Sequence, residues 1–326
     1  MPKTFPIISP DPLQILSSIL PIVEQAHLVT ICQDALGSVA DQVSSRLVLG
    51  LDDPETGLGI TGDPTTDLPL VLIEYFCNFC FWAEKDQPKW TVEWPVGTFQ
   101  DGWYALVACF RRALEEGIPI LDPNYLTSLT LKQVQHLFRG TNSAEIPLLQ
   151  ERLANLREAG EIITTRFGGD FTNWLETTGY DAIKIVQHLA ADFPCYRDVA
   201  TFYGKPVYFY KRAQWAAHSL TYVPGLKITG IDQLAAMADY KLPQILRHLG
   251  VFSYAPELAT QVDSFTLIPQ GSQAELEIRA STVWAVELLR QRLPSATATD
   301  VDNALWLLSQ NLPSPKPYHR TYTIYY

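Results

Sequence analysis

The segment from Phe209 to Gly250 decides the fold, and it contains three short stretches in order. They read Phe209-Tyr-Lys-Arg-Ala-Gln-Trp215, Val223-Pro-Gly-Leu-Lys-Ile-Thr-Gly230 and Ala238-Asp-Tyr-Lys-Leu-Pro-Gln-Ile-Leu-Arg-His-Leu-Gly250. The Pro-Gly pair predicts a tight turn between two helices. Pro243 is tolerated only in the first turn of a helix, so the helix ending at Gly250 should begin close to Asp239. The predicted order is helix, Pro-Gly turn, helix, aspartate, helix.

This order places the Asp239 carboxylate at the N-terminus of a helix. Free backbone amides and the positive end of the helix dipole favour the ionised form of a carboxylate there. The alternative is that Asp239 acts only as an N-cap. Lys211 and Arg212 are consecutive in the preceding predicted helix, so they point to different sides and one of them can face inward.

The rest of the chain adds helices and few strand signals. Helices are predicted, from apolar spacing and from length, over residues 68–82, 101–117, 131–138, 146–163 and 182–189. Alternation over residues 90–97 predicts a short hairpin, the Asp, Pro and Gly cluster over 51–59 predicts a loop, and Gly168-Gly169 is typical of a helix cap. The sequence therefore predicts a mainly α fold with a small β hairpin or sheet.

Length and composition limit the number of domains. A chain of 326 residues with 47% hydrophobic residues can bury one large core. We expect one domain over residues 1–326 that could divide into two lobes, with an N-terminal helical region over 1–66 and the main body over 67–326. The most apolar stretch, residues 68–82, is shorter than the ~20 residues that a membrane-spanning helix needs, so we expect no membrane partner.

Charge and cysteine content exclude further classes. The formal charge of -11 repels a nucleic-acid backbone, so a duplex is not expected as a partner, whereas a small anionic ligand in a local basic pocket is. The five cysteines form an odd set and the N-terminus lacks the pattern of a secretory signal, which predicts reduced thiols and a cytoplasmic protein. Cys77 and Cys80 have CxxC spacing without a second pair, so we interpret them as buried structural residues and predict no metal site.

Several motifs in one register carry a family resemblance. They are Asn78-Phe-Cys-Phe-Trp82, Phe209-Tyr-Lys-Arg-Ala-Gln214, Ala238-Asp-Tyr-Lys-Leu-Pro-Gln244, Glu275-Leu-Glu-Ile-Arg279, Tyr318-His-Arg320 and Ile324-Tyr-Tyr326. The order of helix, hairpin and aspartate resembles the helix-hairpin-helix DNA glycosylases, which cleave N-glycosidic bonds. Together the motifs resemble the queuosine-salvage family, the queuosine 5'-phosphate N-glycosylases, from about Leu68 to the C-terminus.

The resemblance implies an N-glycosyl hydrolase that releases queuine and ribose 5-phosphate from queuosine 5'-phosphate, for salvage into tRNA modification. It implies a small-molecule nucleotide as partner, no cofactor, and Asp239 and Lys211 as the catalytic pair. Breaking an N-glycosidic bond builds positive charge on the sugar, and an ionised Asp239 would stabilise that charge. Lys211 could polarise the reacting centre, hold Asp239 or contact the phosphate. We expect the chain to act as a monomer.

The remaining candidates are substrate-binding residues. Asn78, Phe79, Phe81 and Trp82 combine an amide with flat surfaces that can stack on a base, although core packing is the alternative. The others are Met237, Tyr240, Arg212, Glu277, Arg279 and His319. Met237 stands where the family pattern has an aromatic residue, and Lys241 where it has arginine. Glu277 and Arg279 alternate with apolar residues, which could mean a strand edge, a buried ion pair or ligand contacts. His319 and Arg320 lie in a tyrosine-rich tail that we expect to pack back on the body.

Two other functions fit part of this pattern. A DNA or RNA base glycosylase would use the same helix, hairpin and aspartate, but the acidic chain lacks a basic stripe that would bind a polymer. A noncatalytic nucleoside-binding protein would use Asp239 only as a cap and Lys211 only as a surface cation. That alternative predicts ligand binding without turnover.

Overall fold

The computed structural model describes residues 9–47, 60–310 and 312–326, so the loop predicted over 51–59 lies outside the described residues. The helices are α1 (Ile15–Gln25), α2 (Leu36–Leu47), α3 (Pro64–Phe76), α4 (Gly102–Glu115), α5 (Pro123–Ser128), α6 (Leu131–Leu137), α7 (Leu149–Phe167), α8 (Phe171–Glu176), α9 (Ala182–Asp192), α10 (Lys211–Ser219), α11 (Lys241–His248), α12 (Pro256–Asp263), α13 (Gln273–Arg290) and α14 (Ala298–Gln310).

Three antiparallel strand pairs accompany these helices. They are β1 (Val29–Ile31) with β6 (Phe252–Tyr254), β2 (Thr91–Glu93) with β3 (Phe99–Asp101), and β4 (Val199–Phe202) with β5 (Lys205–Tyr208). The prediction of a mainly α fold with small β elements is confirmed. The β2–β3 pair is a short hairpin, as predicted, but β3 lies beyond the predicted range of 90–97.

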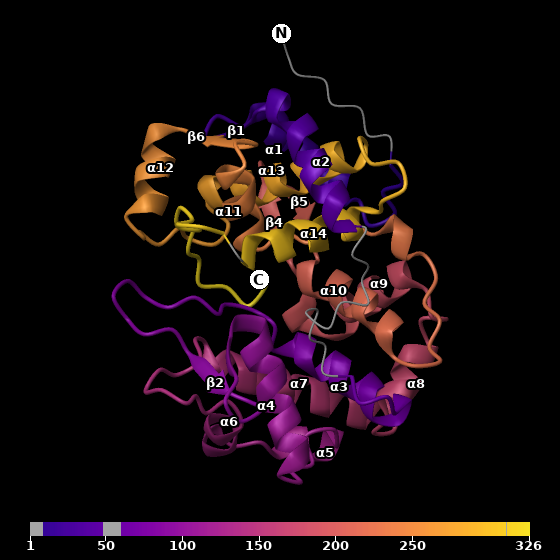
Figure 1. Ribbon diagram of the computed structural model, residues 1–326. Helices are drawn as coiled ribbons and strands as arrows, with labels where there is room; N and C mark the ends of the chain where they lie inside the picture. The colour runs from indigo at the N-terminus through magenta and orange to yellow at the C-terminus, as the bar shows by residue number, and fades with distance from the viewer. Residues whose placement is uncertain (1–8, 48–59, 311) are drawn as a thin grey trace.

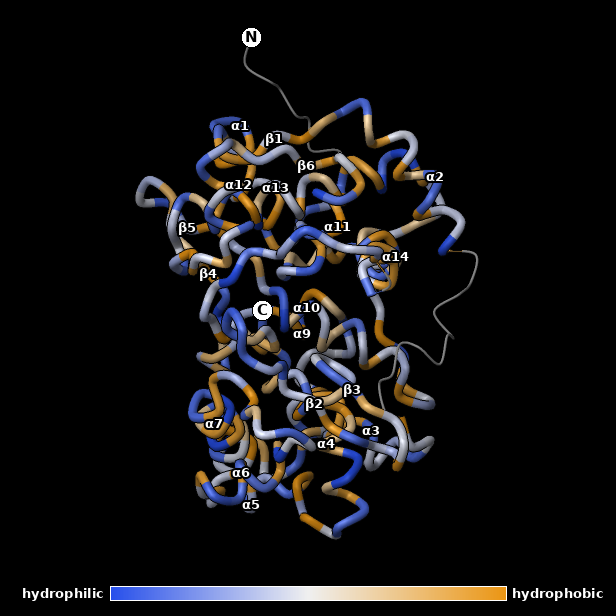
Figure 2. Tube along the Cα trace, turned by 60° about the vertical axis from the view of Figure 1, so that its left-hand side comes forward, coloured by the Kyte–Doolittle hydropathy of each residue, from blue (hydrophilic) through white to orange (hydrophobic). Residues whose placement is uncertain are grey.

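The elements form two groups with α10 between them. Figures 1 and 2 show α1, α2 and α11 to α14 gathered at one end of the molecule, and α3 to α7 at the other. α1 packs against α13, and α2 packs against α13 and α14, so the start and the end of the chain build the same group. The single domain over residues 1–326, with an N-terminal region over 1–66 and a main body over 67–326, stays a prediction.

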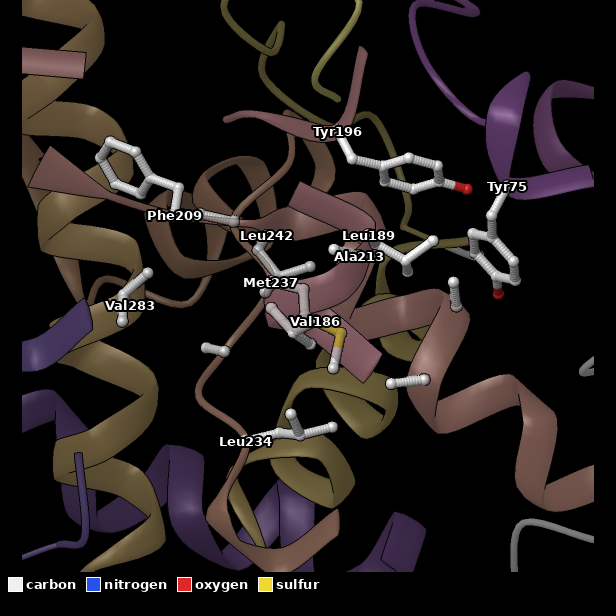
Figure 3. Close-up of a cluster of buried hydrophobic side chains, with 14 of the residues drawn as sticks. Tyr75, Val186, Leu189, Tyr196, Phe209, Ala213, Leu234, Met237, Leu242 and Val283 are labelled. Atoms are coloured by element: carbon white, nitrogen blue, oxygen red, sulfur yellow. The ribbon is translucent and has the colours of Figure 1, made fainter. Parts of the chain in front are cut away.

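One apolar core extends through both groups. Its buried side chains include Tyr75 from α3, Val186 from α9, Ala213 from α10, Leu242 from α11 and Val283 from α13. Figure 3 shows these side chains around α10 in a single cluster. Because α10 is packed from both sides, its first residue, Lys211, is held in a fixed position relative to both groups.

The predicted helix over 68–82 is too long, because α3 ends at Phe76. The N-terminus of α3 is set by Asp63, whose side chain accepts a hydrogen bond from the Thr65 amide, and by Pro64 in the first turn. The chain then continues without regular structure, and Cys80 adopts a φ of 46°. The apolar pattern continues past Phe76 because this segment is buried too, so hydropathy alone does not mark the end of the helix.

The predicted helix between the Pro-Gly turn and Asp239 is also wrong. The turn is present, with Gly225 at a φ of 79°, but only a three-residue 3-10 helix, Ile231–Gln233, follows it. The chain then runs without helix to Tyr240, and α11 starts at Lys241. Leu234, Ala236 and Met237 are buried in the core here, which suits an extended segment between packed helices.

The C-terminal tail packs back on the body, as predicted. The Cys80 amide donates a hydrogen bond to the backbone oxygen of Tyr326 at 2.9 Å, and Tyr326 is buried. Residues 275–279 lie in α13, so the strand alternative for Glu277 and Arg279 is wrong. Gly168 caps α7 with a φ of 66°, as expected of a helix-ending glycine.

The five cysteines are free, and Cys77 and Cys80 are buried, as the structural interpretation predicted. Within the residues that the structure describes, no helix combines the length and the apolar composition needed to cross a membrane.

Candidate active site

A pocket lies where the two groups of elements meet. Its walls come from the end of α3, the segment after it, the start of α4, α10, the start of α11, α14 and Tyr326. Six of the residues predicted from sequence line it, and they are Asn78, Phe79, Phe81, Lys211, Asp239 and Tyr240. Residues separated by more than 200 positions in the chain therefore meet in one pocket.

Asp239 lies just before α11 and is held by the start of that helix. Its Oδ1 accepts hydrogen bonds from the Lys241 amide at 2.7 Å and the Leu242 amide at 2.9 Å. Burial raises the pKa of Asp239, while Lys211 and the two amides lower it. The sequence-based expectation that Asp239 favours its ionised form rested only on the helix terminus. The buried surroundings outweigh those amides, so Asp239 holds protons more readily than an ordinary aspartate.

Lys211 is the first residue of α10, and its side chain is buried beside Asp239. Burial lowers the pKa of Lys211 to about 8, the carboxylate of Asp239 raises it, and the nearby Arg212 lowers it. Lysine with this pKa is mostly charged at neutral pH but can lose its proton at mildly alkaline pH. The pocket therefore contains a carboxylate and an ammonium whose ionisations depend on each other.

Asp302 in α14 is a second buried carboxylate that the sequence analysis missed. Its Oδ2 accepts a hydrogen bond from the Met237 amide at 2.7 Å, whereas Oδ1 has no hydrogen-bond partner in the described part of the chain. Burial raises the pKa of Asp302 well above its usual range, and the charge of Asp239 raises it further. Burial therefore favours the protonated form of Asp302, and its hydrogen bond to the Met237 amide holds the segment that carries Asp239.

The same helix supplies a further face of the pocket. Asn303, Trp306 and Gln310 line the pocket at spacings of three and four residues, so they lie on one side of α14. That spacing was present in the sequence as a signal. These residues were not predicted because none of the motifs that carry the family resemblance includes them.

Aromatic side chains form much of the remaining wall. Tyr75 stacks on Trp103 with ring centroids 5.1 Å apart, and the Tyr75 hydroxyl lies 2.6 Å from the Ser219 hydroxyl. Trp215 and Trp306 also line the pocket. Flat apolar surfaces with amide groups between them suit a heterocyclic base that stacks and forms hydrogen bonds at its edge.

Three charged residues share one part of the pocket. The Lys89 Nζ lies 2.8 Å from the Asp101 carboxylate, and Lys241 is close enough that the Lys89 charge, second to burial, lowers its pKa. Asp101 is the N-cap residue of α4, but its side chain makes no capping hydrogen bond and pairs with Lys89 instead. The carboxylates of Asp239 and Asp101 both raise the pKa of Lys241, so the two cations of this part of the pocket lie near two carboxylates.

Three predicted binding residues lie outside the pocket lining. Arg212 is buried and donates hydrogen bonds to the backbone oxygens of Tyr75 and Phe76 at 3.0 Å each, and to that of Cys195. Met237 is buried in the core cluster of Figure 3. Trp82 packs against Tyr322 of the tail, with ring centroids 4.5 Å apart.

Glu277, Arg279 and His319 also have their polar groups engaged elsewhere. Glu277 accepts hydrogen bonds from three backbone amides of residues 27–29 that lead into β1. Arg279 forms a buried ion pair with Asp198, which was one of its three predicted alternatives. His319 is buried beside Tyr326, and burial lowers its pKa to about 3. It is therefore neutral and is not available as a cation.

Comparisons with known proteins agree on one family. Residues 65–326 match the family model described as queuosine salvage protein. A protein of Sphaerobacter thermophilus named queuosine 5'-phosphate N-glycosylase/hydrolase is 40% identical over 97% of this chain and 98% of its own length. Proteins with the same name from Mus musculus and Nematostella vectensis are 37% and 35% identical, each over 76% of this chain and 79% of their own length.

Proposed function

The chain belongs to the queuosine salvage protein family, and we propose that it hydrolyses the N-glycosidic bond of queuosine 5'-phosphate to release queuine and ribose 5-phosphate. The observation that carries this proposal is the Asp239 carboxylate, held by two backbone amides beside the buried Lys211 in a pocket with aromatic walls. A single nucleotide offers this pocket a base to stack, a sugar to place near Asp239 and a phosphate to bind.

Asp239 stabilises the transition state electrostatically. As the bond to the base breaks, positive charge develops on the sugar, and a fixed carboxylate next to it favours the transition state over the ground state. Hydrogen bonds from the described residues reach only Oδ1 of Asp239, so Oδ2 is the atom that faces the sugar or orients the attacking water. Asp239 must be ionised for either task.

Lys211 keeps Asp239 ionised. Burial opposes the carboxylate charge, and the Lys211 ammonium is the largest of the effects that support it. The charge of the lysine also attracts electron density that builds up as the base departs. Asp302 contributes by position, because its hydrogen bond to Met237 fixes the segment that ends at Asp239.

The leaving base is bound through its edges and faces. A 7-deazapurine has a carbon atom at position 7, so the enzyme cannot protonate the base there to assist departure. Hydrogen bonds at the other edge must then stabilise the leaving group, and the amides of Asn78, Asn303 and Gln310 line the pocket for that purpose. Trp103 and Trp306 supply stacking surfaces.

The phosphate binds Lys241 and Lys89. The cations among the pocket-lining residues are Lys89, Lys211 and Lys241, and Lys211 faces the buried carboxylates. Lys89 pairs with Asp101, and Lys241 lies near the carboxylates of Asp239 and Asp101, so a phosphate dianion there meets two ammonium groups at the pocket wall. Arg279 and His319, which the sequence offered as phosphate partners, are buried outside the pocket.

The substrate is a free nucleotide and the enzyme acts in the cytoplasm as a monomer. The formal charge of -11 repels a polynucleotide, and five free cysteines fit a reducing compartment.

Turnover is tested by incubating the protein with queuosine 5'-phosphate and following both products by mass spectrometry. The proposal predicts queuine and ribose 5-phosphate in equal amounts. Ligand binding without product would contradict it and would favour a nucleoside-binding protein.

The phosphate assignment is tested with Lys241→Gln. It should raise KM for queuosine 5'-phosphate by about tenfold, the size of one charge-assisted hydrogen bond, and leave KM for queuosine nearly unchanged. Lys132→Gln, at an exposed lysine of α6 outside the pocket, is the matched control. Equal effects of Lys241→Gln on the two substrates would contradict the assignment.

A further inference from the structure

We infer that Asp198 and Arg279 form a positioning unit that fixes Lys211 at the start of α10 and Tyr326 at the pocket wall. Neither residue lines the pocket. The inference rests on the proposed function, since it concerns how the proposed catalytic lysine is held. It replaces the sequence-based expectation that Arg279 contacts the substrate.

Asp198 accepts hydrogen bonds from three consecutive backbone amides at the start of α10. Its backbone oxygen accepts from the Phe209 amide at 3.1 Å and the Tyr210 amide at 3.4 Å, and its Oδ2 accepts from the Lys211 amide at 3.2 Å. The side chain of Asp198 thus caps a helix from outside that helix. Any displacement of Asp198 moves the backbone of Lys211.

The start of α10 needs this external support. Tyr210, the N-cap residue, has a φ of 50° and offers no side-chain capping bond. A residue with a Cβ atom in the left-handed region is strained and persists only where neighbouring residues hold it. Asp198 supplies the hydrogen bonds that hold it.

Arg279 in turn holds Asp198. Its two terminal nitrogens donate to the two carboxylate oxygens of Asp198 at 2.9 Å and 2.7 Å, and both side chains are buried. The Arg279 guanidinium also lies 3.9 Å from the centre of the Phe209 ring and 4.6 Å from that of Tyr326. A planar group held by a bidentate pair and by two rings has one orientation.

The same guanidinium extends the unit to the pocket wall. Its Nη1 lies 3.6 Å from Oε1 of Glu275, and that oxygen accepts a hydrogen bond from the Tyr326 hydroxyl at 3.0 Å. Tyr326 lines the pocket. Arg279 therefore connects the start of α10 to Tyr326 through its hydrogen bonds to Asp198 and its ion pair with Glu275.

A positioning role predicts a change in kcat without a matching change in KM. Arg279→Lys keeps the charge but loses the two-pronged contact, so we expect kcat with queuosine 5'-phosphate to fall by about tenfold or more, with KM within about twofold. Asp198→Asn should behave in the same way. The matched control is Arg247→Lys, because Arg247 forms an equivalent two-pronged pair with Asp263 outside the pocket.

A double-mutant cycle with Lys211→Met separates positioning from general loss of stability. If Arg279 acts through Lys211, Arg279→Lys should lower kcat little further once Lys211 is absent. Additive losses, an unchanged kcat, or a rise in KM alone would overturn the inference. Should Arg279→Lys and Asp198→Asn not fold, Glu275→Gln applies the same test with a smaller expected loss.

A measurement that needs no catalytic activity tests this inference independently of the proposed function. Lysines dimethylated with carbon-13 report their own ionisation by NMR, and Lys211→Arg identifies the Lys211 signal. We expect the midpoint of Lys211, about 8 in the wild type, to move in Asp198→Asn and to stay in Arg247→Lys. An unmoved midpoint would contradict the positioning unit even if the protein hydrolyses nothing.

Discussion

At the scale of single residues, opposing effects set the ionisation of Asp239. Burial raises its pKa, and the Lys211 ammonium and two backbone amides lower it. Lys211 is subject to the reverse balance, because burial lowers its pKa to about 8 and the Asp239 carboxylate raises it. The proposed reaction needs both charges at once, so its pH range is limited on both sides.

The pH dependence of kcat/KM should therefore be bell-shaped. Activity falls at acid pH as Asp239 gains a proton, above the usual range of an aspartate, and falls above pH about 8 as Lys211 loses one. Lys211→Arg should move the alkaline limb to higher pH, because a guanidinium keeps its charge. Lys132→Arg serves as the control. An alkaline limb at the same pH in Lys211→Arg would show that another group causes it.

Part of the site could be predicted from sequence because a local signal marked it. Pro243 restricted the start of α11, so Asp239 was placed at a helix terminus, and Lys211 preceded it in the family pattern. Asp302 was missed because its role depends on the Met237 amide, 65 positions earlier in the chain. The cations Arg212 and Arg279 were predicted as binding residues, since a sequence does not show the backbone oxygens and carboxylates that occupy them.

At the scale of elements, Arg212 joins α10 to the end of α3. It donates to the backbone oxygens of Tyr75, Phe76 and Cys195, and its guanidinium lies 4.7 Å from the centre of the Tyr196 ring. These contacts satisfy carbonyl groups that the last turn of α3 leaves open.

Arg212→Lys should act on stability more than on substrate binding. It removes the guanidinium donors of the buried Tyr75 and Cys195 carbonyl groups, while the Phe76 carbonyl group keeps the Asn155 side-chain amide, so we expect the free energy of unfolding to fall by about 3 kcal/mol, measured in urea. KM should stay within about twofold, since Arg212 does not line the pocket. A large rise in KM without a loss of stability would restore Arg212 as a binding residue.

The contact between α5 and α7 gives a second test at this scale. A Cβ atom at Gly160 would lie 2.5 Å from the Pro123 backbone oxygen and 2.6 Å from the Thr127 amide nitrogen. Gly160→Ala should lower the free energy of unfolding by about 2 kcal/mol because backbone cannot move aside easily. Gly37→Ala, in α2 with no atom within 4 Å of the new Cβ, should instead raise it by up to about 1 kcal/mol. Equal Tm values for the two variants would contradict this packing.

The elements themselves followed the sequence where periodicity was clear. α4, α6 and α9 lie where apolar spacing placed them, and β2 lies where alternation predicted the hairpin, although β3 follows that range. The helix predictions were wrong where apolar residues are buried without being helical. Residues 77–82 and 234–239 are mostly apolar and buried, but they lie outside the helices and strands.

At the scale of the whole molecule, His319 in the C-terminal tail makes the stability of the fold depend on pH. His319 is buried, and burial, with the charge of Arg279, lowers its pKa to about 3. The unfolded chain binds this proton near pH 6.5, so between about 6.5 and 3 the unfolded state holds more protons than the folded one. The contribution of His319 to stability is therefore full above that window and is lost as the pH falls through it.

His319→Gln should reduce the acid sensitivity of the protein. One group of this kind changes the free energy of unfolding by up to about 1.4 kcal/mol per pH unit. The drop in Tm between about pH 7 and about pH 5 should be smaller in His319→Gln than in the wild type. His248→Gln, at an exposed histidine, is the matched control. An identical drop in His319→Gln and wild type would contradict the buried neutral imidazole.

The pocket at the junction of the two groups depends on the whole chain, since its walls come from α3, α10, α14 and Tyr326. The central claim is that Asp239 carries the chemistry there. The measurement is kcat for queuine release from queuosine 5'-phosphate by wild type and Asp239→Asn, with Asp232→Asn as an exposed control. The account predicts a loss of about a thousandfold or more in Asp239→Asn at similar KM, because the amide keeps the shape and removes the charge. Equal release by wild type and Asp239→Asn would contradict it.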